Sequence, residues 1–305
     1  MNHTRILVIH KQSGISEMRA TGHAAATRTQ QACDDPVFAP IVAPLIAAHD
    51  AHTEAMAHVR KVLKGHRHLR VVWRHNLSGI IPDSFDLVIT IGGDGTILHA
   101  SHAIGRTPIL GINSSPATSV GYFTAGDAQQ ISALLTAFLD GGARTRNCYR
   151  MEVRVNGEVV NSRVLNDVLF CHECPASTTR YKLIHDDYQE MQISSGMWIA
   201  TASGSTAAIH AAGGTVMPHA AKELQYLVRE PAISASDKGF LPAQRVRGMV
   251  GCDDTFAIQS TIASARLYVD GPHVAIPIRF GDIVTFHGGA APLTLLVGPA
   301  PANPR

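Results

Sequence analysis

The residue types best suited to chemistry lie together at residues 92–96, Gly-Gly-Asp-Gly-Thr. Gly92, Gly93 and Gly95 lack a Cβ, so they can take positive φ and bring backbone N–H groups close to an anion such as a phosphate. Asp94 stands among them, and a carboxylate repels a phosphate unless it holds a metal ion or takes a proton from an attacking hydroxyl. The pattern therefore predicts phosphoryl-transfer chemistry, and the plainer alternative is a tight turn with a solvated carboxylate.

The segments on both sides of this turn must position it. Residues 87–91 are a short apolar, β-branched run, which suits the interior of a parallel sheet covered on both faces. A helix expected to begin near Thr96 would add its unpaired amides and the positive end of its dipole to the same place. Strand, glycine turn and helix in this order are the layout of a phosphate site.

The composition bounds the class of protein. The chain has 305 residues, 45% of them hydrophobic and 16% charged, which indicates a compact protein with room for two domains. A formal net charge of +2 argues against a general nucleic-acid or membrane-surface binder. No apolar run has the length that a membrane-spanning helix needs. We therefore expect small-molecule partners, no nucleic acid and no membrane.

The cysteines indicate a reducing compartment. Five cysteines, an odd number in a chain this long, do not form the pattern of a disulfide framework. The N-terminus lacks the long apolar core of a signal peptide, so we expect a cytoplasmic protein. Cys171 and Cys174 form a CxxC pair, but structural zinc needs four ligands and no second pair appears. No metal ligand of the protein itself is predicted with certainty.

The first half of the chain alternates between strand and helix patterns. Strands are expected at 5–10, 69–73, 87–91 and 107–113, and helices at 43–66 and 127–139, whereas the polar segment 11–36 suits a loop or a poorly formed helix. This order predicts a Rossmann-like α/β domain over residues 1–146. Ligands of such sheets collect at the carboxyl ends of strands, so Asn113 and the ring of Tyr122 are expected beside the glycine turn.

The pattern changes to period two after Tyr149, and Asn156-Gly157 is a strong hairpin signal. We expect a mostly β domain over residues 147–287 and a tail, 288–305, that docks on the first domain. Within the β domain, residues 194–214 read as a strand, a hydroxyl-rich glycine turn and an alanine-rich helix. A flat ligand could approach such small residues closely, and the plainer alternative is a tightly packed core helix.

Four motifs taken together resemble the NAD kinase family in order and spacing. They are Gly92-Gly-Asp-Gly-Thr96, Gly111-Ile-Asn113, Leu165-Asn-Asp167 and Ser203-Gly-Ser-Thr-Ala207 followed by Gly213-Gly214. The resemblance covers about residues 5 to 286. The loop after Asn113, Ser195-Gly196 and Val228-Arg-Glu-Pro231 are more similar to the mitochondrial-type branch than to the common bacterial one.

The resemblance implies a Rossmann-like domain, a β-sandwich domain and transfer of the ATP γ-phosphate to the adenosine ribose 2′-hydroxyl of NAD or NADH. Asp94 would be the catalytic base, and Mg²⁺ carried mainly by ATP would neutralise charge. The phosphate-binding set would be Gly92, Gly93, Gly95 and Thr96. The NAD-binding set would be Asn113, Tyr122, Asn166, Asp167, Ser195, Ser203, Ser205, Thr206 and Ala207. Family members are usually homodimers or homotetramers, and no tightly bound cofactor is implied.

Two other functions stay open from the sequence. One is a lipid or other small-molecule kinase of the same superfamily, which shares the first motif but is not expected to share the later ones. The other is a non-catalytic sensor that binds NAD(H), against which the retention of Asp94 and Asn166 argues. The sequence departs from the family at Asp167, where Glu is commoner, at Ser195, where Asp is common, and at Ala208, which replaces a Tyr.

Overall fold

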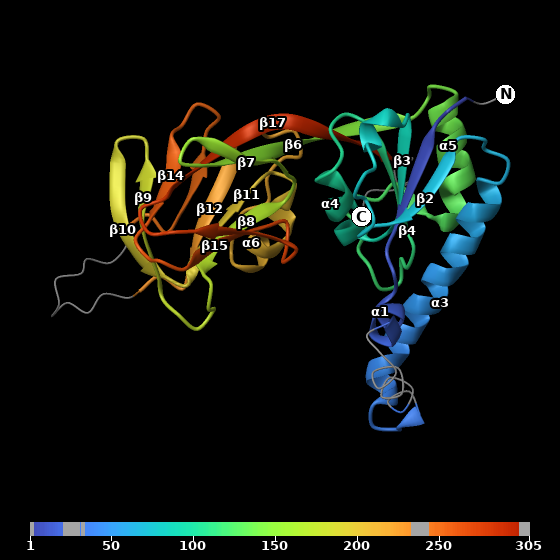
Figure 1. Ribbon diagram of the computed structural model, residues 1–305, viewed down its shortest axis with the longest axis horizontal. Helices are drawn as coiled ribbons and strands as arrows, with labels where there is room; N and C mark the ends of the chain where they lie inside the picture. Colours follow the sequence, from blue (N-terminus) through green and yellow to red (C-terminus); the bar gives the residue numbers. More distant parts are fainter. Residues whose placement is uncertain (1–2, 21–30, 32–33, 233–243, 299–305) are drawn as a thin grey trace. The chain divides into compact units, whose positions relative to one another are not determined.

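The computed structural model describes residues 3–20, 31, 34–232 and 244–298. The chain divides into two compact units, Met1–Arg146 with Thr294–Arg305, and Asn147–Leu293. The two long strands β6 (Arg144–Val155) and β17 (Ile283–Val297) each carry the chain from one unit into the other (Figure 1). Residues 288–305 are expected to be a tail that docks on the first domain; in the structure residues 288–297 continue the strand that begins at Ile283, and Leu295 pairs with Ile109.

The first unit is built on a parallel sheet in the order β4-β3-β1-β2. Its strands are β1 (Ile6–His10), β2 (Leu69–Trp73), β3 (Leu87–Gly92) and β4 (Ile109–Asn113), with β5 (Gly126–Asp127) paired to β4 and the end of β17 joined at Leu295. Every residue of β3 and β4 is buried, which explains why both read as unbroken apolar runs. Gly92 of β3 pairs with Asn113 of β4, so the two motifs end side by side.

Helices cover this sheet on both faces (Figure 1). They are α1 (Gly14–Ala20), α3 (Ala39–Val62), α4 (Asp94–Ser101) and α5 (Ile131–Leu139), with 3-10 turns η1 (Pro82–Ser84) and η2 (Ala128–Gln130). Met56 and Val59 of α3 and Ile131 of α5 pack with Ile89 in one core, so α3 and α5 share a face. The Rossmann-like prediction for this unit is confirmed.

Two local predictions need correction, and the structure decides a third that the sequence leaves open. The helix after the glycine turn begins at Asp94 rather than near Thr96, because the turn itself supplies its first residues. The helix expected at 43–66 spans Ala39–Val62, and Gly65 follows it at a φ of +99°. For the polar segment 11–36 the sequence leaves a loop and a poorly formed helix open, and the structure has a short helix there, α1. Residues 21–30 and 32–33 of that segment lie outside the described residues.

The second unit contains two antiparallel sheets. One has the order β10-β9-β14-β17, with β6 paired to β17 and β7 paired to β6, and the other has the order β13-β12-β11-β8-β15-β16. The bounds not yet given are β7 (Glu158–Val164), β8 (Asp167–His172), β9 (Thr179–His185), β10 (Tyr188–Ser194), β11 (Gly196–Ala200), β12 (Leu224–Arg229), β13 (Arg247–Val250), β14 (Phe256–Ser260), β15 (Ala265–Val269) and β16 (Val274–Ile278).

The core of this unit lies between the two sheets. Leu183 and Ile258 of the first sheet and Phe170 and Leu267 of the second belong to one cluster of fully buried side chains. Two sheets packed face to face in this way form a β-sandwich, as expected. Between β11 and β12 the chain makes a 3-10 turn, η3 (Gly204–Thr206), and the short helix α6 (Ala208–Ala211). The predicted alanine-rich helix is thus a single turn.

The hairpin signal proved specific. Asn156 and Gly157 join β6 to β7 with φ values of 51° and 87°, the left-handed conformation that an Asn-Gly turn supplies at little cost. The Asn156 side chain also accepts from the Ile283 amide at 2.9 Å, which ties the turn to β17.

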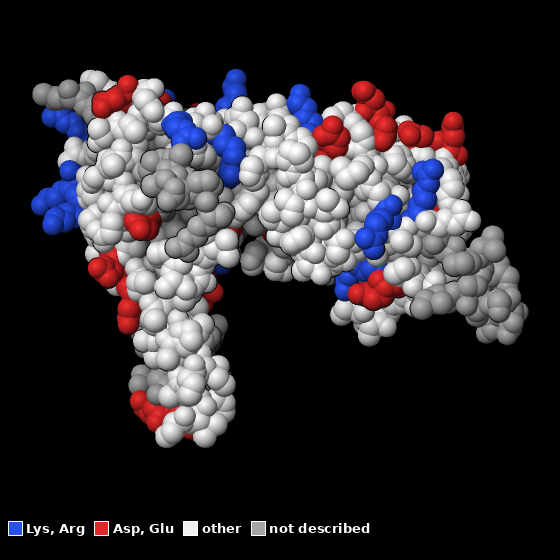
Figure 2. Space-filling model, turned by 180° about the vertical axis from the view of Figure 1, so that it is seen from behind, with Lys and Arg blue, Asp and Glu red and all other residues white. Residues whose placement is uncertain are grey.

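The surface agrees with the modest net charge. On the face seen in Figure 2, Lys and Arg side chains lie interspersed with Asp and Glu side chains of the described residues. Of the helices described, none is long and apolar enough to cross a membrane.

Candidate phosphate and nucleotide site

The glycines of the turn are required for space rather than for positive φ. None of Gly92, Gly93 and Gly95 has a positive φ, so that part of the prediction is wrong. A Cβ at Gly92 would collide with the Thr96 hydroxyl, and one at Gly93 would lie 2.6 Å from the Ser119 hydroxyl. A Cβ at Gly95 would meet nothing within 4 Å, so Gly95 leaves open space above the turn.

The carboxylate of Asp94 is fixed by two backbone amides from a distant loop. Tyr122 N donates to Oδ2 at 2.9 Å and Phe123 N donates to Oδ1 at 2.8 Å. Each carboxylate oxygen has a second lone pair, so both can still accept a proton or a hydrogen bond from a ligand. Asp94 is also the first residue of α4, where its negative charge interacts favourably with the positive end of the helix dipole.

Two buried hydroxyls beside the turn have no hydrogen-bond partner among the residues that the structure describes. They belong to Thr96 and Ser114, which are 1% and 2% exposed. Buried hydroxyls normally find a partner, and the exceptions call for an explanation such as a missing ligand. Ser114 N donates to Gly92 O at 3.0 Å, so both hydroxyls belong to the end of the β3–β4 pair.

Asn113 shapes the loop that follows β4. Its Oδ1 accepts from Ser115 N at 3.1 Å and its Nδ2 donates to Ser119 O at 3.1 Å, so the side chain closes residues 113–119 into a compact loop. Asn113 is 6% exposed. The structure thus places it beside the glycine turn, as expected, with an internal hydrogen-bonding role that the sequence did not reveal.

Tyr122 reaches the turn through its backbone as well as its ring. Its ring is half-buried and lies 5.4 Å from the Arg146 guanidinium carbon, and Arg146 Nη2 donates to Tyr122 O at 3.1 Å. Arg146 therefore holds the loop whose amides bind Asp94. The expected aromatic neighbour of the turn is present, and its main contribution to Asp94 is an amide.

In the second unit, Asp270 anchors the Asn166-Asp167 motif. Its Oδ2 accepts from Leu165 N at 2.8 Å, and its Oδ1 accepts from Asn166 N at 2.7 Å and Asp167 N at 3.1 Å. Asp270 takes a φ of 50° at the end of β15 to reach these amides. The Asn166 side-chain oxygen is left buried without a partner.

The environment of Asp167 disfavours the ionised form of its carboxyl group. Asp167 is 6% exposed, and burial, followed by the charge of Asp270, raises its pKa to about 7. Its side chain therefore titrates near neutral pH, where carboxylates are normally ionised. Perturbed carboxylates of this kind are typical of functional sites, although structural pairs also produce them.

The second glycine turn packs directly on this motif. Thr201 N donates to Asn166 O at 2.9 Å and Thr201 Oγ1 donates to Leu165 O at 2.5 Å. Gly204 lies against the Asn166 backbone with no room for a side chain. Residues 165–167, which lead into β8, and the start of η3 thus pack directly against each other.

The remaining predicted residues differ in exposure. Thr206 is exposed, Ala207 and Ser195 are partly exposed, and Ser203 is buried. The Ser205 hydroxyl is fully buried, donates to Ala202 O at 2.7 Å and accepts from Met217 N at 2.9 Å. Those bonds hold the turn together, so a ligand contact for Ser205 stays a prediction.

Gly204→Ala is expected to destabilise the second unit by about 2–3 kcal/mol, since its methyl group would overlap the Asn166 carbonyl and force the backbone to move. Urea unfolding would measure the loss. The matched control is Gly142→Ala, where the nearest atom to the new Cβ lies at 3.8 Å. Equal stability of the two variants would contradict the close packing described for Gly204.

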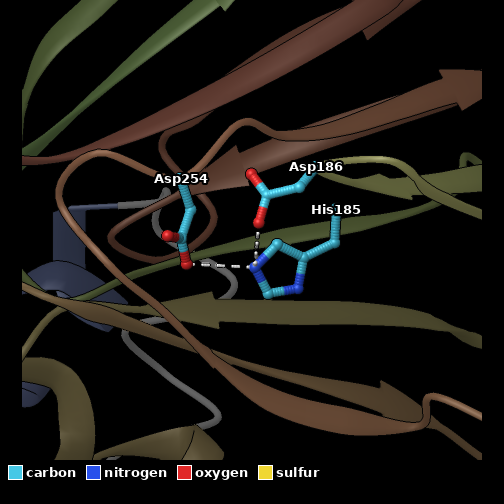
Figure 3. Close-up of side chains that lie close together, drawn as sticks. All are labelled: His185, Asp186 and Asp254. Carbon is cyan, nitrogen blue, oxygen red and sulfur yellow. Dashed lines mark hydrogen bonds and ion pairs between the residues drawn. The ribbon is translucent and has the colours of Figure 1, made fainter.

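A group with metal-ligand chemistry lies elsewhere in the second unit. His185, Asp186 and Asp254 place one ligand atom each within 4.8 Å of one another (Figure 3). His185 Nε2 lies 3.1 Å from Asp254 Oδ2. Gly251 N donates to Asp254 at 2.7 Å and Thr255 N donates to Asp186 at 2.9 Å, so both carboxylates already fasten adjoining turns. The backbone hydrogen bond from Gly251, followed by the side-chain hydrogen bond with His185, lowers the pKa of Asp254.

Sequence reasoning missed the residues that hold the motifs in place. These are the Phe123 amide, Asp270 and Arg146. Asp270-Gly271 carried a turn signal, but no local pattern indicates which amides a turn carboxylate will accept.

Each unit therefore presents, by itself, polar groups that suit a ligand. The glycine turn combines a fixed carboxylate with unpartnered hydroxyls and open space above Gly95, which suits a phosphate and an attacking hydroxyl. The Asn166-Asp167 motif presents an unpartnered amide oxygen and a carboxylate, which can accept hydrogen bonds from sugar hydroxyls.

Known proteins resemble this chain along most of its length. Residues 19–143 match the family model described as the ATP-NAD kinase N-terminal domain. A rice (Oryza sativa subsp. japonica) protein named "Probable NADH kinase" is 35% identical over 249 residues, 74% of this chain and 75% of its own length. An Arabidopsis thaliana protein named "NADH kinase" is 31% identical over 247 residues, 73% of this chain and 76% of its own.

Two solved structures share the fold. An NAD kinase from Archaeoglobus fulgidus in complex with ATP has a TM-score of 0.62 at 18% identity, over 96% of this chain and 93% of that one. Yeast NADH kinase complexed with NADH has a TM-score of 0.67 at 16% identity, over 98% of this chain and 85% of that one. With the identity and coverage of the plant relatives, the motifs place the chain in a family of phosphotransferases: it belongs to the NAD kinase family.

Proposed function

We propose that this protein transfers the γ-phosphate of ATP to the 2′-hydroxyl of the adenosine ribose of NAD or NADH and so forms NADP or NADPH. The observation that carries the proposal is the Asp94 carboxylate, held at the glycine turn by two amides with lone pairs still open. A carboxylate so placed can take the hydroxyl proton as the oxygen attacks phosphorus, which is general base catalysis. Membership of the NAD kinase family supports the choice of substrates.

Positioning accounts for the rest of the turn's role. In phosphoryl transfer the protein mainly aligns the attacking and leaving oxygens and stabilises charge on the phosphate. The backbone of Gly92, Gly93 and Gly95 and the Thr96 hydroxyl would hold the ATP phosphates. The unpartnered state of that hydroxyl fits a ligand that supplies the missing partner.

Magnesium would arrive as part of the substrate MgATP. Of the described residues in the glycine turn, Asp94 alone offers a carboxylate, which is too few for a cage built by the protein. Mg²⁺ usually keeps several waters and binds one or two carboxylates together with substrate phosphates, so this donor set suits MgATP. The ion would neutralise charge on the phosphates during transfer.

The second unit would bind NAD(H). Asn166 and Asp167 would accept hydrogen bonds from sugar hydroxyls and amide groups, with Ser203, Thr206 and Ala207 beside the adenine and Ser195 on the nicotinamide side. For Asn113 and Tyr122 of the first unit, NAD binding is proposed from the family resemblance. The buried Asn166 oxygen without a partner supports a polar ligand there.

The test is an endpoint assay with MgATP and either NAD or NADH, in which a coupled dehydrogenase reads the NADP(H) formed. We expect product from at least one of the two. Absence of product together with intact nucleotide binding would favour a sensor, and phosphorylation of a lipid in a detergent mixture instead of NAD would favour the lipid kinase. Parallel arms with NAD and NADH give the preference between them.

We further propose a homodimer or homotetramer in the cytoplasm, in line with the family resemblance. Of the cysteines among the described residues, Cys171, Cys174 and Cys252 are free thiols, which suits a reducing compartment. A gel-filtration mass equal to one chain would contradict the assembly.

A further inference from the structure

Two cations stand at the end of the parallel sheet where the glycine turn begins. Lys11 follows the last residue of β1, and its N–H donates to Ile91 O at 3.2 Å, one residue before Gly92. Arg74 follows the last residue of β2, and its N–H donates to His10 O at 2.9 Å. The register of the sheet therefore brings Lys11 between the glycine turn and Arg74.

The side chain of Lys11 runs along the turn. Its Cδ lies 3.4 Å from the position that a Cβ would take at Gly92, and the unpartnered Thr96 hydroxyl occupies the same side of Gly92. Nζ is two bonds beyond Cδ. The Lys11 Cδ and a buried hydroxyl without a partner among the described residues thus lie on one face of the turn, and the ammonium and the hydroxyl can both donate to an oxygen anion.

The Lys11 ammonium lacks a counter-ion in the part of the chain that the structure describes. Arg74 pairs with Glu17 at 3.4 Å, whereas no carboxylate there forms an ion pair with Lys11. Partial burial lowers the pKa of Lys11, the charge of Arg74 lowers it further, and Glu17 opposes both. A half-buried ammonium of this kind gains most from an anionic ligand, because the ligand replaces both its lost water and its missing counter-ion.

The backbone of Lys11 is held from a helix. His52 of α3 is 6% exposed, and its Nε2 lies 3.0 Å from Lys11 O. Burial lowers the pKa of His52 to about 4, so at neutral pH its imidazole is uncharged and Nε2–H donates to this carbonyl. The Lys11 side chain therefore starts from a fixed point beside the turn.

We propose that Lys11 is a phosphate-binding residue of this site, with its ammonium on the terminal phosphates of the donor nucleotide. This inference rests on the proposed function, since it takes the glycine turn as the site of the ATP phosphates. An ammonium on the transferring phosphoryl group stabilises charge on the phosphate oxygens and the leaving oxygen during transfer, so it contributes to the rate as well as to binding.

The first test measures binding without turnover, by calorimetry with inorganic tripolyphosphate on the parent chain, Lys11→Met, Lys11→Arg and the exposed control Lys64→Met. We expect Lys11→Met to weaken binding at least about tenfold, the range for a charge-assisted hydrogen bond, while Lys11→Arg keeps part of the affinity. Lys64→Met is expected to bind as the parent does. Equal affinities for the parent and Lys11→Met, or no binding by the parent, would overturn the proposal.

The second test separates this inference from the proposed function. In the NADP-forming assay, Lys11→Met is expected to raise KM for MgATP and lower kcat, with KM for NAD unchanged within about twofold, because the proposal places the ammonium on the donor phosphates. If Lys11→Met forms NADP with the kcat and KM of the parent, the proposed role of Lys11 is wrong and the proposed kinase activity stands. If tripolyphosphate binding depends on Lys11 but no NADP forms, Lys11 binds phosphate and the proposed kinase activity is wrong.

Discussion

Asp94→Asn is expected to lower kcat by about three orders of magnitude, within the range that a general base contributes. The amide cannot take a proton from the attacking hydroxyl, although it has almost the shape of the carboxylate. KM for MgATP and NAD should change much less, since the glycine backbone and the second unit are untouched. Steady-state kinetics with NAD as acceptor measures both constants.

Asparagine is a sharper test here than alanine. The carboxylate accepts from both the Tyr122 and Phe123 amides, so Asp94→Ala would leave two donors without a partner and disturb their loop. Asp94→Asn keeps one acceptor, and its expected stability loss is about 1–2 kcal/mol. Asp140→Asn, an exposed substitution in the same unit, is the control. If kcat of Asp94→Asn equals that of the parent, Asp94 is not the general base.

Asp167→Asn is expected to stabilise the protein at alkaline pH and to impair its use of NAD. Burial and Asp270 raise the pKa of Asp167 to about 7, whereas the unfolded chain has a pKa near 3.9. The folded state therefore holds a proton between about pH 4 and 7 that the unfolded state has lost. The free energy of unfolding of the parent falls over that window as pH rises, and stays low above it.

The variant lacks this titration. Its free energy of unfolding should therefore exceed that of the parent by an amount that grows from near zero at pH 4 to about 3–4 kcal/mol at pH 8. Urea unfolding at pH 5 and pH 8 measures the difference, and Asp187→Asn at an exposed site serves as the control. The same change should raise KM for NAD, since an ionised carboxylate at this position is the better acceptor for sugar hydroxyls. An advantage independent of pH would contradict the raised pKa.

A gain in stability together with weaker use of NAD in Asp167→Asn would distinguish a functional carboxylate from a structural one. A residue kept only for packing would be expected to stabilise the fold in its native ionisation state. Asp167 instead costs stability when it is ionised, and it sits beside an amide oxygen that is buried without a partner. Strain of this kind is commonly retained where a ligand relieves it.

The local sequence was sufficient for the elements and for the motifs. The buried run 87–91 and the order of strand, glycine turn and helix follow from side-chain periodicity and residue types, and the Asn156-Gly157 hairpin follows from the φ values that these two residues allow. Such properties act over a few residues, so one sequence contains them. The two-unit arrangement of an α/β part and a β part was readable for the same reason, because the period changes after Tyr149.

The tertiary structure alone decided what surrounds each motif. The glycines of the turn were expected for their φ freedom, yet Gly92 and Gly93 are needed because Thr96 and Ser119 pack against them. The amides that fix Asp94 come from residues 122 and 123, and the carboxylate that fixes 165–167 comes from Asp270. These contacts depend on which strands become neighbours and in what register, which no local pattern contains. Burial follows from the same long-range packing, so the pKa of Asp167 and the isolation of the Lys11 ammonium appear only once the chain has folded.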